Sequence, residues 1–300
     1  MATAIHTEGL TKRFGSTLAL DQLTLDVAEG EVFGFLGPNG AGKTTTIRLL
    51  LGVIRATAGN ARVFDLDPWS DAVNLHRRLA YVPGELSVWP NLTGAETLEL
   101  LGAMHGGHDA VYRDELCRRF DFDPEKKARS YSKGNRQKIG LIAALMTRAD
   151  LLVLDEPTSG LDPLMELVFR ECVAEARDRG QTVFLSSHIL AEVEALCSRV
   201  GILRRGQLVE VGTLDELRHL SARTVEVAFR GTPPALDGIP GVDAVARTDG
   251  KVRFQVRGDA GPMLKALCAA DVVAIDSREP SLEELFLAHY GAGAADGADQ

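Results

Sequence analysis

The stretch GPNGAGKT, residues 37–44, constrains the fold of this chain more than any other. It matches the pattern G-x-x-x-x-G-K-[ST] in full, between an expected strand at Val32–Leu36 and an expected helix at Thr45–Leu51. Glycines let the backbone N–H groups of such a loop point inward at an anion, and the helix start adds the positive end of its dipole. A strand, a glycine-rich loop and a helix in this order predict an α/β fold with a phosphate-binding site.

The residue types in this loop indicate a nucleoside triphosphate. Lys43 can bridge the β- and γ-phosphates, and the Thr44 hydroxyl can coordinate Mg²⁺. A chance glycine-rich turn is the alternative, and the flanking strand and helix disfavour it. The expected nucleotide-binding residues are Gly37, Pro38, Asn39, Gly40, Ala41, Gly42, Lys43, Thr44 and Thr45.

Two acidic residues follow a second apolar run, LLVLDEPTSGLD, which begins at residue 151. The Asp155 carboxylate can hold Mg²⁺ through water. Side chains alternate along a strand, so Glu156 is expected on the other side, beside the γ-phosphate, where it can polarise an attacking water. The alternative is a pair of acids at an exposed strand end, which the apolar run and the Pro157-Thr158 turn disfavour.

A histidine ends a third apolar run, TVFLSSH, residues 182–188. A lone histidine at a strand end is usually structural. Because the phosphate loop and the acidic pair accompany it, we expect His188 to contact the γ-phosphate.

Apolar strand-like runs alternate with amphipathic helix-like runs through about residue 212, which is typical of an α/β fold with a mostly parallel sheet. The expected helices include segments 163–180 and 189–200. Between about residues 86 and 148 the pattern is helical throughout, with a Thr93/Glu96 capping box, and we interpret this block as an insertion in the core.

A smaller α+β domain is expected at residues 221–290, after a first domain at residues 1–220. Three segments there alternate with period two, and Asp249-Gly250 predicts a hairpin. A helix is expected near residue 261, and another after Pro280 with a Ser281/Glu284 capping box. Residues 291–300 are poor in apolar side chains and are expected to be disordered.

Composition narrows the functional classes. A net charge of −9 and a pI near 5.3 disfavour a nucleic-acid binder. No run approaches the 18 apolar residues of a membrane span, and the first residues lack the apolar region of a secretory signal. The cysteines form no C-x-x-C pair and are expected to be buried thiols in a reducing cytoplasm: Cys117, Cys172, Cys197 and Cys268.

Four motifs together resemble those of the ATP-binding cassette (ABC) ATPases. They are GPNGAGKTT, YSKGNRQ, LLVLDEPTSGLD and SSH, in this order, and the resemblance spans about residues 5–220. It is closest to the nucleotide-binding subunits of drug and antibiotic efflux transporters, which also carry an appendage ending in a segment like EPSLEELFLAHYG. The resemblance implies a P-loop ATPase core with a mostly parallel sheet, an antiparallel β region and a helical insertion.

The resemblance also implies a partner. In this family two cassettes face each other head to tail and enclose two ATP molecules, and the loop corresponding to YSKGN covers the ATP of the other cassette. Ser132 would be the N-cap of a helix whose backbone donors face the partner's γ-phosphate. The residues that correspond to this signature loop are Ser132, Lys133, Gly134 and Asn135.

Further residues acquire expected roles by resemblance alone. Ser159, Gly160 and Asp162 match the loop that communicates across the dimer. Phe14 would stack on adenine, a contact typically worth about 1–3 kcal/mol; the alternative is a core aromatic. Trp89 would lie near the groove that accepts a segment of a membrane subunit; the alternative is a tryptophan packed inside the helical block.

The sequence departs from the family pattern at two places. The usual signature loop is Leu-Ser-Gly-Gly-Gln, and here Lys133 replaces a glycine and could add charge at the γ-phosphate or turn outward. A glutamine that usually touches Mg²⁺ is replaced by Gly84, so either Glu85 substitutes as the metal contact or the contact is lost. We interpret Arg136 and Lys138 as ordinary helix-surface charges.

The expected function is that of an ATP-hydrolysing motor subunit, with Lys43, Glu156 and His188 as catalytic residues and ATP with Mg²⁺ bound. The expected partners are a second cassette, as a homodimer, and a separate integral membrane subunit, with no nucleic acid. The chain would then lie on the cytoplasmic face of the membrane and export drugs or similar small molecules. The alternatives are an import ATPase and a soluble ABC ATPase that acts on ribosomes or DNA.

Overall fold

The computed structural model describes residues 2–219, 223–231, 233–248, 251–268 and 270–278. The chain divides into two compact units, Met1–Val211 and Gly212–Gln300. The division falls after Val211, whereas the sequence analysis placed the first domain's end at residue 220.

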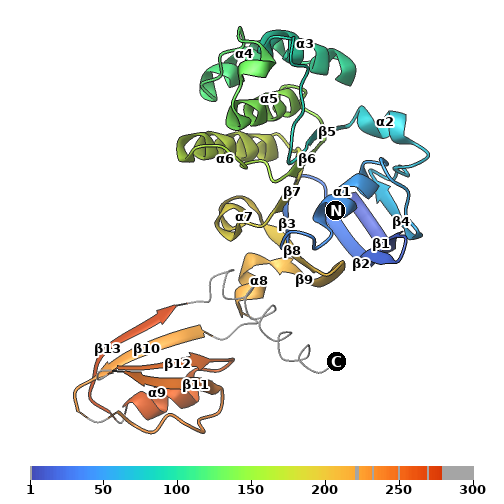
Figure 1. Ribbon diagram of the computed structural model, residues 1–300. Coiled ribbons are helices and arrows are strands. Elements are labelled where there is room, and N and C mark those ends of the chain that lie inside the picture. The colour runs from blue at the N-terminus through green and yellow to red at the C-terminus, as the bar shows by residue number, and fades with distance from the viewer. Residues whose placement is uncertain (1, 220–222, 232, 249–250, 269, 279–300) are drawn as a thin grey trace. The chain divides into compact units, whose positions relative to one another are not determined.

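The first unit is built on a six-stranded sheet with the order β5-β6-β7-β3-β8-β9, and the pairs among its first five strands are parallel (Figure 1). All residues of β3, β6 and β7 are buried, as expected for parallel strands that are covered on both faces. This confirms the predicted α/β fold. The strands are β3 (Val32–Leu36), β5 (Leu79–Val82), β6 (Leu151–Asp155), β7 (Thr182–Ser187), β8 (Arg199–Arg204) and β9 (Gln207–Thr213).

A three-stranded antiparallel sheet, with the order β2-β1-β4, forms the expected antiparallel region. One hydrophobic cluster joins it to the parallel sheet, because Ile5 and Leu25 from the antiparallel strands pack with Phe35 of β3. The strands are β1 (Thr3–Phe14), β2 (Thr17–Ala28) and β4 (Ala58–Val63).

Helices connect the parallel strands. The helix predicted at residues 189–200 is wrong at its end, because α7 stops at Leu196 and Arg199 already pairs in β8 beside β3. These helices are α1 (Lys43–Leu50), α2 (Ala72–His76), α6 (Pro163–Asp178) and α7 (Leu190–Leu196).

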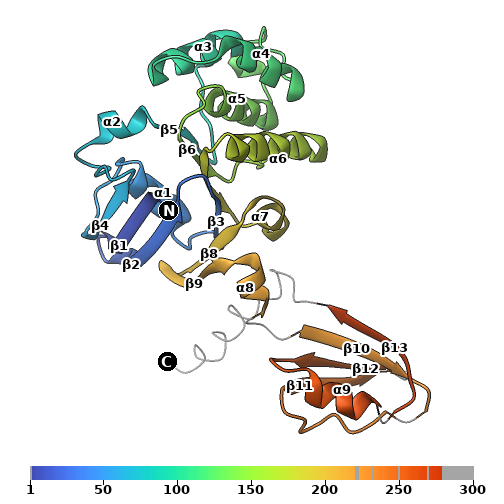
Figure 2. The same cartoon turned by 180° about the vertical axis from the view of Figure 1, so that it is seen from behind.

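The helical insertion consists of α3, α4 and α5, with α3 and α4 both packed on α5, and the grouping is visible from both sides (Figures 1 and 2). The Thr93/Glu96 capping box is present at the start of α3. Within the described residues, no helix combines the length and the apolar character that crossing a membrane requires. The elements are α3 (Gly94–His105), α4 (Ala110–Arg119), the short 3₁₀ helix η1 (Ala128–Ser130) and α5 (Lys133–Leu145).

The interpretation of Arg136 and Lys138 as surface charges is wrong for Lys138, whereas Arg136 is partly exposed. Lys138 is 8% exposed, and its ammonium group donates to the Asp121 carbonyl. The Arg136 guanidinium donates to the Tyr131 carbonyl at 2.9 Å. Both cations bond backbone acceptors of the helical insertion.

The second unit contains a four-stranded antiparallel sheet, with the order β11-β12-β10-β13 and its own hydrophobic core around Val227 and Phe254. The predicted hairpin is present, because Thr248 pairs with Lys251; the two residues between them lie outside the described residues. The helix and capping box predicted after Pro280 and the tail at 291–300 also lie outside them. The elements are α8 (Leu214–His219), β10 (Arg223–Phe229), β11 (Val242–Thr248), β12 (Lys251–Val256), α9 (Gly261–Cys268) and β13 (Val272–Arg278).

The four cysteines are free thiols, and three of them are buried. Burial raises the pKa of the Cys172 thiol to about 12. Cys268, at the end of α9, is exposed, so the expectation that all four are buried is wrong there.

Candidate nucleotide-binding and hydrolysis site

The order β6-β7-β3 brings the three sequence motifs to one edge of the parallel sheet. Parallel strands present their carboxyl ends together, and ligands of α/β proteins bind at that edge. In this register Asp155 lies opposite Ser186, and Leu36, the residue before the phosphate loop, lies opposite Ser187. The strand order, which the sequence motifs did not predict, is what assembles the site.

The phosphate loop packs closely against the backbone of neighbouring strands. A side chain at Gly37 would meet the Leu203 carbonyl oxygen at 2.6 Å, and one at Gly42 would meet the Ala19 carbonyl oxygen at 2.8 Å. Gly42 also has a φ of +115°, which favours glycine. α1 begins at Lys43, earlier than the predicted Thr45, so Lys43 and Thr44 belong to its first turn.

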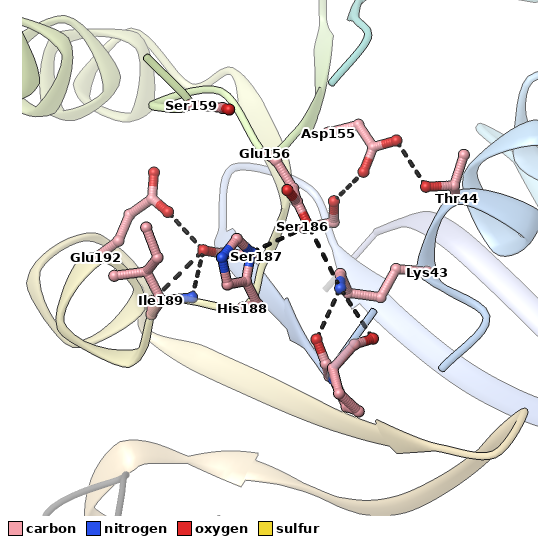
Figure 3. Close-up of polar contacts among 12 residues, drawn as sticks. Lys43, Thr44, Asp155, Glu156, Ser159, Ser186, Ser187, His188, Ile189 and Glu192 are labelled. Carbon is pink, nitrogen blue, oxygen red and sulfur yellow. Dashed lines mark hydrogen bonds and ion pairs between the residues drawn. The ribbon is translucent and has the colours of Figure 1, made fainter. Parts of the chain in front are cut away.

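The Lys43 ammonium group lies inside the loop, and the residue is 5% exposed. It donates to the Gly37 carbonyl at 2.7 Å and to the Pro38 carbonyl at 3.3 Å, and it lies 3.5 Å from Glu156 Oε1 (Figure 3). Burial lowers the Lys43 pKa, and the charges of Glu156 and Asp155 oppose that shift. The loop therefore holds a buried cation that has an acidic group as its direct neighbour.

Asp155 ends β6 and makes two hydrogen bonds. The Thr44 hydroxyl donates to its Oδ2 at 2.9 Å, and the Ser186 hydroxyl donates to its Oδ1. Mg²⁺ prefers oxygen ligands such as a carboxylate and a hydroxyl, so this pair suits the ion that the sequence predicts. Ser186 was missed in the sequence analysis, although a polar residue at the end of a buried strand was a signal.

Glu156 lies beyond the end of β6 and has a φ of +50°, an uncommon conformation for a residue with a side chain. Its backbone N–H donates to the Ser186 carbonyl at 3.0 Å. Its Oε1 lies 3.1 Å from His188 Nδ1, so the carboxylate stands between the histidine and Lys43 (Figure 3). Strand alternation was thus the wrong reason for its direction, since the left-handed backbone aims it instead.

An added side-chain carbon at Gly84 would stand 3.4 Å from the Asp155 carbonyl oxygen. Glu85, the next residue, is exposed, and neither Asp155 nor Thr44 has a hydrogen bond or ion pair with it in the described part of the chain. It lines a cavity of about 430 Å³ together with Gly84, Lys133 and Arg136. Both alternatives, a metal contact from Glu85 and a lost contact, stay predictions.

The signature loop precedes α5 as predicted, with Ser132 as an N-cap that accepts from the Asn135 N–H at 3.2 Å. Lys133 bonds within its own chain, because its ammonium group donates to the Ser159 hydroxyl at 2.9 Å. Gly134 lies so close to the backbone of Gly160 that an added side-chain carbon would stand 2.4 Å from its carbonyl oxygen. The signature loop thus contacts the loop that follows the acidic pair.

Gln137, which the sequence analysis missed, adds a buried link between the same two segments. Its amide donates to the Pro157 carbonyl at 3.0 Å, and the side chain is 2% exposed. A glutamine on the buried face of an otherwise apolar helix was the available signal. Asp162 has a local role, since it caps α6 by accepting from the Leu164 and Met165 N–H groups.

Phe14 and Trp89 are too exposed for the alternative roles, which were packed positions inside the protein. Phe14, at the end of β1, is 49% exposed, with the Lys12 ammonium 4.9 Å from its ring centroid. Trp89 is 46% exposed. Neither is a core aromatic, and the adenine contact of Phe14 and the groove position of Trp89 stay predictions.

A phosphate loop, an acidic pair and a histidine at one edge of a parallel sheet define a P-loop nucleoside triphosphatase. Residues 20–159 match the family described as ABC transporter, and residues 212–290 match the ATP-binding protein DrrA1-3-like, C-terminal domain.

Relatives and solved structures extend this likeness over the chain. The bacitracin transport ATP-binding protein BcrA of Bacillus licheniformis is 34% identical over 98% of this chain and 99% of its own. The daunorubicin resistance ATP-binding protein DrrA3 of Streptomyces coeruleorubidus is 36% identical over 95% of each chain.

Among solved structures, an ATP-binding subunit of an ABC transporter is 30% identical, with a TM-score of 0.66 over 72% of this chain and 92% of that one. A dimeric ATP-binding cassette in a post-hydrolysis state, bound to ADP and phosphate, shares the fold at 20% identity, with a TM-score of 0.64 over 70% of this chain and 98% of that one.

The chain belongs to the ATP-binding proteins of ABC transporters. It is therefore the ATPase subunit of a transporter, and it groups with the proteins that serve drug and antibiotic resistance.

Proposed function

We propose that two copies of this chain drive a separate membrane subunit that exports drug-like small molecules. The names of two relatives support this assignment, because one serves bacitracin transport and the other daunorubicin resistance, and both align over nearly the whole chain. The match of the second unit to a DrrA-like C-terminal domain supports it further. These likenesses favour export over import, and over an action on ribosomes or DNA.

The observation that carries the proposed chemistry is the contact of Glu156 with both Lys43 and His188. Lys43 would bind the β- and γ-phosphates in place of its present contacts with the loop carbonyls. Glu156 would accept the proton of the attacking water, a contribution of about 10²–10⁴-fold. His188 would donate to the γ-phosphate from the other side of Glu156.

Thr44 and Asp155 would hold Mg²⁺, because their oxygens lie together and Ser186 fixes the carboxylate. Bound Mg²⁺ would neutralise charge on the phosphate oxygens. Asn39 and the non-proline residues beside it in the loop would supply backbone N–H donors, and half-exposed Phe14 would stack on adenine.

The second copy would complete the phosphate site. Ser132 and Lys133 are exposed at the start of α5, where the N–H groups of the first turn and the helix dipole favour an anion. We assign that anion to the γ-phosphate of ATP bound by the partner, with Gly134 and Asn135 completing the loop. Ser159 and Gly160 would then transmit conformational changes between the two ATP sites.

The membrane subunit would dock near Trp89, whose exposed indole lies beside the segment that lines the 430 Å³ cavity. This docking would hold the ATPase at the cytoplasmic face of the membrane. Closure of the two copies around ATP would then move the membrane subunit, and release of phosphate would reopen them.

Glu156→Gln tests the proposed chemistry together with the dimer. The variant keeps the shape of the side chain but cannot take a proton, so we expect normal ATP binding, turnover reduced by about 10²-fold or more, and accumulation of a closed dimer. Turnover is measured by phosphate release and assembly by light scattering with ATP and Mg²⁺.

Lys43→Ala provides the contrast, because it should lose ATP affinity and remain monomeric with ATP. Glu29→Gln changes an exposed carboxylate away from the site and should behave as wild type. Rapid turnover by Glu156→Gln would contradict the proposed base, and a strictly monomeric Glu156→Gln with ATP, even with the membrane subunit present, would contradict the dimer.

A further inference from the structure

A buried carboxyl group that the proposed chemistry does not use lies behind the catalytic histidine. Glu192, in the first turn of α7, is 3% exposed, and its Oε2 accepts from the Ser187 hydroxyl at 2.6 Å (Figure 3). Ser187 is 1% exposed and directly precedes His188. Burying a carboxyl group costs free energy unless hydrogen bonds compensate for the lost contact with water.

The hydrogen bonds form a continuous path into the turn that carries the histidine. The Ser187 hydroxyl donates to Glu192 and accepts from the Ile189 N–H at 2.9 Å. Ile189 is the N-cap of α7, so Glu192 occupies the third helical position, from which a capping-box glutamate bonds the N-cap N–H directly. Here the Ser187 hydroxyl is inserted between the two groups, and its bond to the Ile189 N–H links the residues before and after His188.

The turn at Ser187 and Ile189 sets the position of His188. His188 is 46% exposed, and its Nδ1 contact with Glu156 Oε1 is 3.1 Å. The Ser186 carbonyl, on the same strand, accepts from the Glu156 N–H. Holding the residues on both sides of His188 therefore fixes the backbone from which the imidazole reaches the carboxylate.

We propose that Glu192 is a positioning residue for ATP hydrolysis, which acts through Ser187 to hold His188 against Glu156. This inference rests on the proposed role of the Glu156 and His188 pair. In the described part of the chain, Glu192 has no hydrogen bond or ion pair with Glu156 or His188.

The surroundings of Glu192 affect both its pKa and its hydrogen bonds. Burial raises its pKa, which the Ser187 and Thr158 side chains and the charge of Arg170 oppose, while Glu166 adds to it. Among the described residues its Oε1 has no hydrogen-bond partner, and Ser187 makes its principal polar contact there. Substitutions that remove that acceptor release the Ser187 hydroxyl, to which the Ile189 N–H donates.

The test compares Glu192→Ala, Glu192→Gln and Ser187→Ala in the full-length chain. We expect Glu192→Ala and Ser187→Ala each to lower kcat for ATP by about tenfold or more, because a misplaced catalytic group costs rate, while KM for ATP stays within about twofold. Glu192→Gln retains an acceptor oxygen and should recover most of kcat. Glu194→Ala, in the same helix, is the matched control and should keep the wild-type kcat.

A structural role for Glu192 would lower thermal stability without this pattern, so each change is repeated in a His188→Ala background. If a residue acts through His188, substituting it lowers kcat little further once the imidazole is gone. Wild-type kcat in Glu192→Ala, or the same fold-loss with and without His188, would overturn the inference. If Glu192→Ala does not fold, Glu192→Gln and Ser187→Ala carry the same comparison.

The two proposals fail differently. Rapid turnover by Glu156→Gln removes the basis of both. An inactive Glu156→Gln beside a fully active Glu192→Ala removes only the role of Glu192.

Discussion

Lys133 shows how one substituted residue changes the contacts of a functional loop. In place of a glycine it carries an ammonium group that bonds Ser159 of its own chain. The sequence suggested two alternatives for Lys133, a contact with the partner's phosphate or an outward orientation. Neither alternative included this partner within its own chain. The bond is at the surface, so a nearby phosphate could displace it at little cost.

Lys133→Ala is expected to weaken the ATP-dependent dimer of the Glu156→Gln variant by about fivefold at low salt, or about 1 kcal/mol, because a charge near the partner's phosphate is lost. The loss should shrink at high ionic strength. Dimer dissociation constants from sedimentation measure both effects.

Lys127→Ala, at another exposed lysine of the helical insertion, is the control and should change neither quantity. Ser159→Ala removes the intrachain bond of Lys133 but keeps its ammonium group, so comparing it with Lys133→Ala separates the two contributions. An unchanged dissociation constant for Lys133→Ala at low salt would exclude the phosphate contact.

Helix ends and strand ends carry most of the polar chemistry at the scale of elements. Ser132, Asp162 and Thr93 each cap a helix, and each was visible in the sequence as a hydroxyl or carboxylate before a helical run. The capping box at Thr93 holds the first turn of α3, at the start of the helical insertion.

Thr93→Ala removes the side-chain acceptor for the Glu96 N–H and is expected to destabilise the protein by about 1 kcal/mol. Urea unfolding monitored by circular dichroism measures the change. Thr93→Ser keeps the hydroxyl and should retain the wild-type free energy of unfolding. Equal stability of the alanine and serine variants would show that the cap contributes nothing.

Local patterns predicted the elements well because the apolar strands, the glycine-rich loop and the capping residues act within a few positions. The phosphate loop, β3 and β6 were predicted at nearly their observed bounds. The left-handed backbone of Glu156 and the burial of Lys138 were not, because both depend on residues that are distant in the sequence. Ser186 and Gln137 were missed for the same reason, since their partners lie on other elements.

The whole molecule has two units, each with its own hydrophobic core. A chain with two separate cores can lose the stability of one unit while the other stays folded. The nucleotide site described above lies entirely within residues 2–211, so its chemistry is expected to be independent of the packing of the second core.

Phe254→Ala, at a fully buried position of the second core, is expected to destabilise that unit by about 3–5 kcal/mol while ATP affinity stays at the wild-type value. Calorimetry should show one of two transitions shifted to lower temperature, and fluorescence titration gives the affinity. Phe254→Leu should shift the transition less. A matching fall in ATP affinity would show that the site depends on the second core.

The neighbouring placement of β6, β7 and β3 determines which changes this ATPase can accept over evolution. Adjacent strands lie about 4.8 Å apart, and backbone hydrogen bonds maintain that spacing whatever the side chains are. Inserting or deleting one residue within β6 or β7 would move every later side chain by about 3.3 Å and reverse its face. A change of length in these strands would therefore separate Asp155 from Ser186, whereas a substitution that keeps size and polarity would leave both in place.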